Sequence, residues 1–163
     1  MSPHDSDWPL TPSLLDRLTD LDPDRSQEVP QPDWEIRREI KAALCRDLTD
    51  LLNVRRAEEP VNPSYQEAAE SILTFGLADF TSFNLKNGIE QEMVRRSMEA
   101  AIRHFEPRLS GVTVSLEAPD EQTPVLQFQI AATLKIDAAS EPVVFDAALH
   151  RDSRRMAVSG ETQ

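Results

Sequence analysis

The sequence predicts an α+β domain in which N-terminal helices pack on one face of a three- to four-stranded antiparallel β-meander. Two observations predict this class. Apolar residues recur every three or four positions between residues 33 and 105, and every second position between residues 111 and 159. The first period is that of a helix with one buried face, and the second is that of a strand with one buried face. Helices followed by strands indicate α+β, because an α/β sheet needs the two to alternate.

Composition limits the class of partner. The 163 residues include 29 acidic and 17 basic side chains, for a formal net charge of −12. Binding to nucleic acid or to anionic lipid is therefore disfavoured, and a basic partner fits better. The single cysteine, Cys45, excludes an intramolecular disulfide and a cysteine zinc cluster. No apolar run approaches the roughly 20 residues of a membrane span, and no signal-peptide pattern opens the chain, so we expect a cytoplasmic protein without direct membrane insertion.

Residues 1–32 have the composition of a flexible acidic arm, and residues 33–163 form the predicted domain. The arm holds six of the twelve prolines and seven acids. Within it, "TPSLLDRLTDL" predicts a short helix capped by Thr11. About three turns of helix are not stable alone, so this helix must dock on its own domain or in a partner's groove. Its apolar side consists of Leu14, Leu15, Leu18 and Leu21.

The next helix has the clearest pattern. We expect Asp33 to cap it and the loop "NVRRAEEP" to end it. A shorter helix, "YQEAAESILTF", should open with the capping-box spacing of Ser64 and Glu67 and stop at Gly76. The buried stripe of the long helix consists of Ile36, Ile40, Ala43, Leu44, Leu48, Leu51 and Leu52.

A third helix should begin between Leu85 and Ile89 and end at Glu106, because Pro107 cannot continue it. Between the second and third helices, the connector "LADFTSFN" should cover the core with Leu77, Phe80 and Phe83. The predicted buried stripe of the third helix consists of Ile89, Met93, Ala100, Ala101 and Phe105.

Four alternating runs predict the strands: "GVTVSLEA", "VLQFQIAATLKI", "VVFDAALH" and, after a turn at Asp152 and Ser153, "RRMAVS". The long second run should be paired on both sides, so the first and last runs are the expected edges. An edge strand has free N–H and C=O groups that a partner strand can complete. Arg151, Arg154 and Arg155 give the last edge a cationic flank, or else they form a solvated charged turn.

Motifs of catalysis and metal binding are absent from the sequence. None of the three histidines has a partner at metal-ligand spacing, and no nucleophile elbow or phosphate-binding loop occurs, so no cofactor is expected. In a hydrolase, Glu106 would be the general acid, and Glu117, Asp137 or Asp146 would be the second catalytic carboxylate. Arg108 opposes this role, because a nearby guanidinium lowers the pKa of a carboxyl group. Two alternative functions stay open: a lysozyme-like peptidoglycan hydrolase and a free-standing cytoplasmic protein-binding module.

The stretch "FEPRL" lies at the joint between the third helix and the first strand. Pro107 stiffens the joint, so Glu106 and Arg108 should project toward a partner in fixed directions. The alternative is a local bond between Glu106 and Arg108 that only ends the helix. The candidate partner-binding residues of this joint are Glu106, Pro107, Arg108 and Leu109.

Four stretches together resemble the TssE family of baseplate components of type VI secretion systems, itself similar to the lysozyme-like wedge protein of contractile phage baseplates. They are "SLLDRL", the long helix that closes on "LLNVR", "FGLADF" and "FEPRL". Their order and spacing agree with the family. Ala78 stands where the family usually has proline.

The resemblance implies a structural subunit and not an enzyme. It implies that the E-P-R-L motif docks on a wedge core formed with TssF and TssG, and that TssK is a further baseplate partner. It also implies that an edge strand starts polymerisation of the sheath subunits TssB and TssC. In such a baseplate we expect Leu14, Leu15 and Leu18 to dock on a neighbouring subunit as an amphipathic helix. The expected place is the cytoplasm, at a baseplate docked on the inner membrane.

Overall fold

The computed structural model describes residues 14–18, 32–57, 61–62, 64–69, 71–80, 82–84, 86–117, 125–136, 139–150 and 152–160. Within these ranges helices come first and an antiparallel sheet follows, which confirms the predicted α+β class. The helical elements are α1 (Leu14–Leu18), α2 (Asp33–Asn53), α3 (Gln66–Ala69), the 3-10 turn η1 (Ile72–Thr74) and α4 (Gly88–Phe105). The strands are β1 (Leu109–Leu116), β2 (Val125–Ile136), β3 (Ala139–His150) and β4 (Met156–Gly160).

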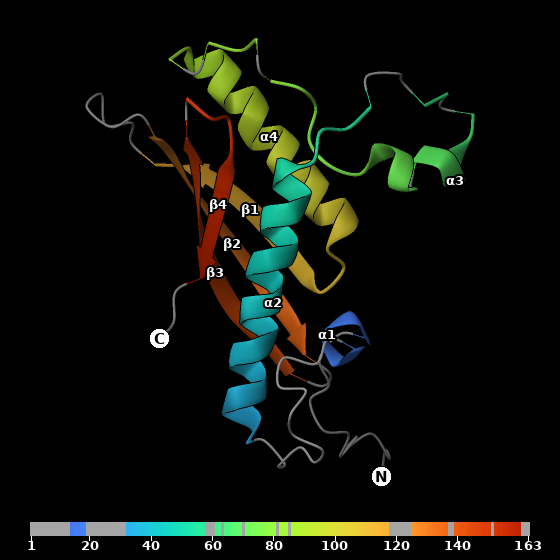
Figure 1. The fold of residues 1–163 in the computed structure, drawn as a ribbon, viewed down its shortest axis with the longest axis vertical. Helices are drawn as coiled ribbons and strands as arrows, with labels where there is room; N and C mark the ends of the chain where they lie inside the picture. Colours follow the sequence, from blue (N-terminus) through green and yellow to red (C-terminus); the bar gives the residue numbers. More distant parts are fainter. Residues whose placement is uncertain are drawn as a thin grey trace.

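The strands are ordered β1-β2-β3-β4, each antiparallel to its neighbour. Among the described residues β1 and β4 are therefore the edges, and the run "VLQFQIAATLKI" is paired on both sides as predicted. Helices α2 and α4 lie on the same face of the sheet (Figure 1), with α4 against β1 and α2 against β4. Each helix thus packs beside an edge of the sheet.

Strand β3 begins four residues before the predicted "VVFDAALH" run, at Ala139. Pro142 interrupts the strand pattern in the sequence, since proline cannot donate to a ladder. The structure accommodates it because β4 pairs with β3 only from Phe145 to Leu149. Pro142 therefore lies where β3 is paired on one side, opposite Thr133 of β2.

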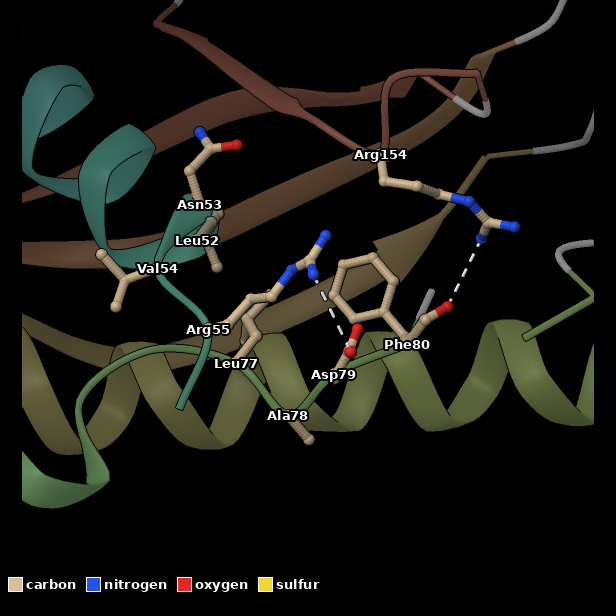
Figure 2. A pocket seen from close by; sticks show the side chains of 9 residues that line it. All are labelled: Leu52, Asn53, Val54, Arg55, Leu77, Ala78, Asp79, Phe80 and Arg154. Carbon is tan, nitrogen blue, oxygen red and sulfur yellow. Dashed lines mark hydrogen bonds and ion pairs between the residues drawn. The ribbon is translucent and has the colours of Figure 1, made fainter. Parts of the chain in front are cut away.

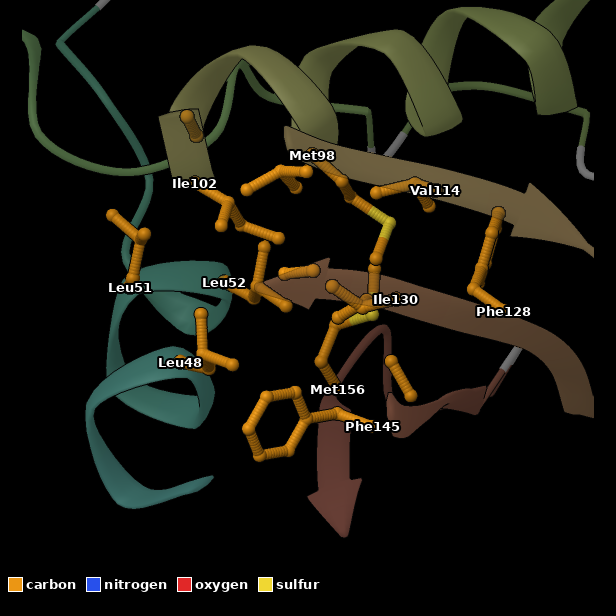
Figure 3. Packing of buried hydrophobic residues seen from close by; sticks show 14 of the residues in the cluster. Leu48, Leu51, Leu52, Met98, Ile102, Val114, Phe128, Ile130, Phe145 and Met156 are labelled. Atoms are coloured by element: carbon orange, nitrogen blue, oxygen red, sulfur yellow. The ribbon is translucent and has the colours of Figure 1, made fainter. Parts of the chain in front are cut away.

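The core lies between the sheet and the two long helices (Figure 3). The fully covered side chains of α2 follow the predicted stripe, and every second residue of β2 and β3 faces them. Burying such a side chain contributes roughly 1.5–3 kcal/mol to folding. The central residues of this core are Leu44, Leu48, Met98, Ile102, Phe128, Ile130, Leu134, Phe145 and Leu149.

The buried side of α4 differs from the predicted stripe. Ile89 is 73% exposed and Met93 is 51% exposed, so the prediction was wrong at both positions. The buried residues of α4 are Gln91, Val94, Met98, Ala101 and Ile102, of which only Ala101 belongs to the predicted stripe. Each residue turns the helix by about 100°, so a stripe read from Ile89 and Met93 faces a different direction. The apolar residues of α4 occupy more than one face of the helix, so their spacing alone does not determine which face is buried.

Two further predictions about the helices are also wrong. Pro32 occupies the cap position of α2 and Asp33 is already helical. The predicted helix "YQEAAESILTF" is divided into α3 and η1. The Ser71 hydroxyl donates to Ala68 O and accepts from Leu73 N–H, so this side chain takes over backbone bonding where a continuous helix would run.

In the described ranges, no helix is long and apolar enough to cross a membrane.

Candidate functional site

The stretch from Phe75 to Phe80 lies against the residues that follow α2. Leu77 N–H donates to Val54 O at 2.9 Å, and Arg56 N–H donates to Leu77 O at 2.8 Å, which forms a short parallel bridge. Gly76 has φ of +101°, and a Cβ atom at this position would lie 2.4 Å from Val54 O. Only glycine combines this backbone angle with so close an approach.

The connector covers the core as the sequence predicted. Leu77 is buried, while Phe80 and Phe83 are half-buried and pack against the core. Behind the connector, Figure 2 shows a small hollow between the end of α2 and the turn that follows β3. Arg55 and Asp79 form an ion pair at 3.9 Å at this hollow.

Arg154 holds the connector from the turn between β3 and β4. Its guanidinium donates to Phe80 O at 3.4 Å and to Phe83 O at 3.1 Å (Figure 2 draws the first of these bonds). The residue is half-buried and has φ of +55°. Arg155 is exposed, and its carbonyl accepts from His150 N–H at 3.0 Å. Of the two arginines, only Arg155 therefore presents an exposed side chain beside β4.

Asn53, the asparagine of the "LLNVR" stretch, reaches the first residue of β4. Its Nδ2 donates to Met156 O at 2.9 Å, and Met156 N–H donates to its Oδ1 at 2.9 Å. The side-chain amide thus makes the same two bonds that a neighbouring strand would make. It satisfies both backbone groups of a residue whose side chain is buried.

The "FEPRL" joint contains the most buried charge among the described residues. The Glu106 side chain is 7% exposed. Arg108 Nε donates to Glu106 Oε1 at 2.7 Å, and Arg108 Nη2 donates to Glu106 Oε2 at 2.6 Å. This bidentate geometry is the strong form of an arginine–carboxylate pair. Glu106 therefore does not project outward as expected, and the local bond with Arg108 is formed.

Asp47 of α2 completes this cluster. Its Oδ2 accepts from Arg108 Nη2, so one guanidinium joins α2 to the end of α4. The hydrogen bonds that Arg108 donates to Glu106, followed by the one it donates to Asp47, raise the pKa of Arg108 above its ordinary value. We call Asp47, Glu106 and Arg108 the Glu106 cluster. Asp47 was not predicted, because it lies 61 residues from Arg108 in the sequence.

The surface of the cluster is made by only some of the predicted residues. Pro107 is exposed, the Arg108 side chain is 30% exposed and the Asp47 side chain is 43% exposed. Leu109 is buried and belongs to the core. Asp47 and Arg108 therefore bring two bonded charges of the cluster to the surface, while Glu106 lies buried beneath them.

The N-terminal helix α1 presents Leu14 and Leu18 to solvent. Leu14 is 71% and Leu18 is 73% exposed, while Asp16 pairs with Arg46 of α2 at 2.8 Å. The side chain of Leu15 lies outside the described part of the chain, as do the predicted cap Thr11 and Leu21.

The residues of the hydrolase reading are not gathered around a common cavity in the described ranges. Both Glu106 oxygens accept from Arg108, Glu117 is exposed just after β1, and Asp146 is exposed on β3. Asp137 and Arg151 lie outside the described residues. Among the residues that the structure describes, no group of three or more His, Cys, Asp or Glu side chains could hold a metal ion.

Residues 38–139 match the family described as baseplate wedge protein gp25. The matched segment runs from the second turn of α2 through the connector, α4, β1 and β2 to the first residue of β3, and it includes the whole Glu106 cluster. No curated protein was found to match the chain.

Proposed function

This chain belongs to the baseplate wedge protein gp25 family, which also includes TssE, and from that premise we propose that it is a TssE-type subunit of a type VI secretion baseplate. The family itself gives the coarser role, that of a structural component of a contractile-tail baseplate. The match over residues 38–139, more than half of the 163, is the observation that carries the proposal. The finer assignment rests on the four TssE-like stretches.

In this proposal the partners are the wedge proteins TssF, TssG and TssK and the sheath subunits TssB and TssC. The protein acts in the cytoplasm at a baseplate docked on the inner membrane, and it carries out no catalysis. The wedge core binds at the corner formed by Pro107, Arg108 and Asp47. The geometry of Arg108 supports docking at this corner. A bidentate bond to Glu106 fixes the guanidinium, so the exposed part of Arg108 meets a partner without a large loss of side-chain entropy.

The same proposal includes a role for β4 in starting sheath assembly. A sheath strand adds to the edge of β4, and the baseplate thereby templates the first ring. Support comes from the sheet order, in which β4 is an edge among the described residues. Backbone groups on an antiparallel strand face alternate sides, and Met156 N–H faces Asn53. Val158 N–H therefore faces outward, while Ala157 N–H faces β3.

Val158→Pro is the variant that tests sheath initiation. It removes the outward donor, so we expect the variant to join the wedge but to form few or no full-length sheaths. Sheaths are counted by negative-stain electron microscopy, and wedge binding is measured by pull-down of the tagged protein with TssF and TssG. Val158→Thr, which keeps the N–H group and the branched side chain, is the matched control. Normal sheaths on a folded Val158→Pro protein would show that strand addition at β4 is wrong.

The exposed leucines of α1 support docking on a neighbouring subunit. Deleting residues 1–30 should leave the melting temperature nearly unchanged, because Leu14 and Leu18 are mostly exposed and the Asp16–Arg46 pair is a surface ion pair. Recovery of wedge subunits in the pull-down should fall by tenfold or more. The full-length Leu14→Ser, Leu18→Ser variant should reproduce this loss, and Asp16→Asn should not. A fall of several degrees in melting temperature would instead mean that the arm stabilises its own domain.

A further inference from the structure

The segment that contains α3 and η1 projects from the body of the fold. Figure 1 shows α3 set apart from the sheet and from the two long helices. Among the described helices and strands, α3 and η1 make extensive contact only with each other. The segment is anchored where it ends, because Phe75 packs against the core and its ring lies edge-on to Phe105, with the ring centroids 5.1 Å apart.

Large apolar side chains of this projecting segment face solvent. Tyr65 is 65% exposed, Ile72 is 85% exposed and Leu73 is 58% exposed. Ile72 is the most exposed large hydrophobic residue in the described part of the chain. Exposed apolar side chains that gather on one short segment mark a site of interaction, whereas scattered ones do not. We call Tyr65, Ile72 and Leu73 the tip residues.

Hydrogen bonds of two hydroxyl groups hold η1 in one conformation. The Ser71 hydroxyl accepts from Leu73 N–H at 3.3 Å and donates to Ala68 O at 2.7 Å. The Thr74 hydroxyl donates to Ser71 O at 3.0 Å. The turn that carries Ile72 and Leu73 is therefore ordered before any partner binds, so little conformational entropy is lost on binding.

The chain around the tip residues is acidic. Residues 57–85 contain five acidic side chains and no lysine, arginine or histidine. One of the five, Glu67, is exposed on α3 between Tyr65 and η1. Negative charge beside exposed apolar side chains disfavours an anionic lipid surface and nucleic acid, and it favours a protein surface that is apolar with a basic rim.

We propose that the tip residues insert into an apolar groove of a wedge subunit, and that lysine or arginine side chains at the rim of this groove meet Glu67. This inference rests on the proposed function, which supplies the partner. It adds a second binding surface to the corner at Arg108. The two surfaces are joined by the contact of Phe75 with Phe105, which directly precedes the Glu106 cluster. Two contacts on one rigid body bind more tightly than either contact alone.

The full-length Ile72→Ser, Leu73→Ser variant tests the insertion. Its affinity for the purified complex of TssF and TssG is measured by biolayer interferometry, and its melting temperature by circular dichroism. We expect the dissociation constant to rise by about tenfold or more. The melting temperature should stay nearly unchanged, because both side chains are already exposed in the free protein. Ile72→Ser alone, at the more exposed position, should reproduce much of the loss of affinity.

The matched control is Ile89→Ser, Met93→Ser. It also removes two exposed apolar side chains, which are 73% and 51% exposed on α4. Its dissociation constant should change by less than about twofold, because these residues lie outside the projecting segment.

Glu67→Lys tests the basic rim. It places a like charge against the rim, so it should weaken binding to the complex of TssF and TssG. The difference from the wild-type protein should shrink as the salt concentration rises, because salt screens the repulsion. Glu67→Gln should weaken binding less than Glu67→Lys. A Glu67→Lys protein that binds as tightly as the wild type would show that the rim is not basic.

The outcomes separate this inference from the proposed function. Normal binding of Ile72→Ser, Leu73→Ser, or an equal loss in the α4 control, overturns the inference and leaves the proposed function standing. Wild-type protein that does not bind TssF and TssG overturns the proposed function, and the inference with it. Binding to vesicles of phosphatidylcholine and phosphatidylglycerol that is lost in Ile72→Ser, Leu73→Ser would assign the tip residues to a lipid surface and overturn the inference.

Discussion

Arg108→Ala is expected to lower the free energy of unfolding by about 3 kcal/mol, because it leaves the Glu106 carboxylate buried without its partner. Removing one member of a buried ion pair costs about 3–5 kcal/mol. The lower end applies here, since the Arg108 side chain is 30% exposed. The same substitution releases Asp47 and so breaks a bond between α2 and the end of α4. Urea denaturation followed by circular dichroism measures the change.

Two control variants identify the cause of this loss. Arg108→Lys keeps the charge without the bidentate geometry, so it should lose part of the stability. Glu106→Gln combined with Arg108→Ala removes the unpaired charge and should recover part of the loss seen in Arg108→Ala. If Arg108→Ala lowers the free energy of unfolding by less than about 1 kcal/mol, water reaches Glu106 and the ion pair contributes little to folding stability.

The cluster also provides a variant that separates folding from assembly. Asp47 is 43% exposed, and its loss leaves the pair between Glu106 and Arg108 in place. Asp47→Asn should therefore change the free energy of unfolding by less than about 1 kcal/mol. Weaker capture of TssF and TssG by this variant would support docking at the corner. Unchanged capture of TssF and TssG would mean that the docking surface does not include Asp47.

The parts of the fold predicted from the sequence are those fixed by a long local pattern. The stripe of α2 and the alternation of β2 each span at least twelve residues, and both are confirmed. The buried face of α4 was predicted wrongly because Ile89 and Met93 are apolar but exposed. A rule based on the spacing of apolar residues assigns such residues to the buried face. The start of β3 was not predicted because it contains Pro142. Proline is tolerated there because β4 pairs with β3 only from Phe145 onward, so Pro142 has a neighbouring strand on one side only.

The contacts of the candidate site depend on partners distant in the sequence. Asn53 bonds Met156 across 103 residues, and Arg154 bonds the carbonyl of Phe80 across 74. Neither pair leaves a periodic signal, because each depends on where the finished fold brings a helix end or a turn. The motif "LLNVR" contains Asn53, but the role of this residue as a substitute for a neighbouring strand follows only from the geometry.

Gly76→Ala should destabilise the protein by about 3 kcal/mol, and this tests whether the connector is held in one conformation. A residue other than glycine at φ of +101° is strained, which costs about 1–3 kcal/mol. Its Cβ would also lie 2.4 Å from Val54 O, so the backbone must move. That movement breaks the bonds of Leu77 with Val54 and Arg56, each of which contributes roughly 0.5–1.5 kcal/mol. Urea denaturation measures the loss.

Gly111→Ala is the matched control for backbone strain, because Gly111 has φ of +62° but a Cβ atom there would meet no atom within 4 Å beyond its chain neighbours. It should lose only about 1–2 kcal/mol, the cost of a left-handed conformation alone. Gly88→Ala, where φ is not left-handed and space is open, should lose none. The difference between Gly76→Ala and Gly111→Ala measures the close approach to Val54. If the two variants lose equal stability, the connector moves freely, and Arg154 cannot use Phe80 and Phe83 as a fixed anchor for the turn before β4.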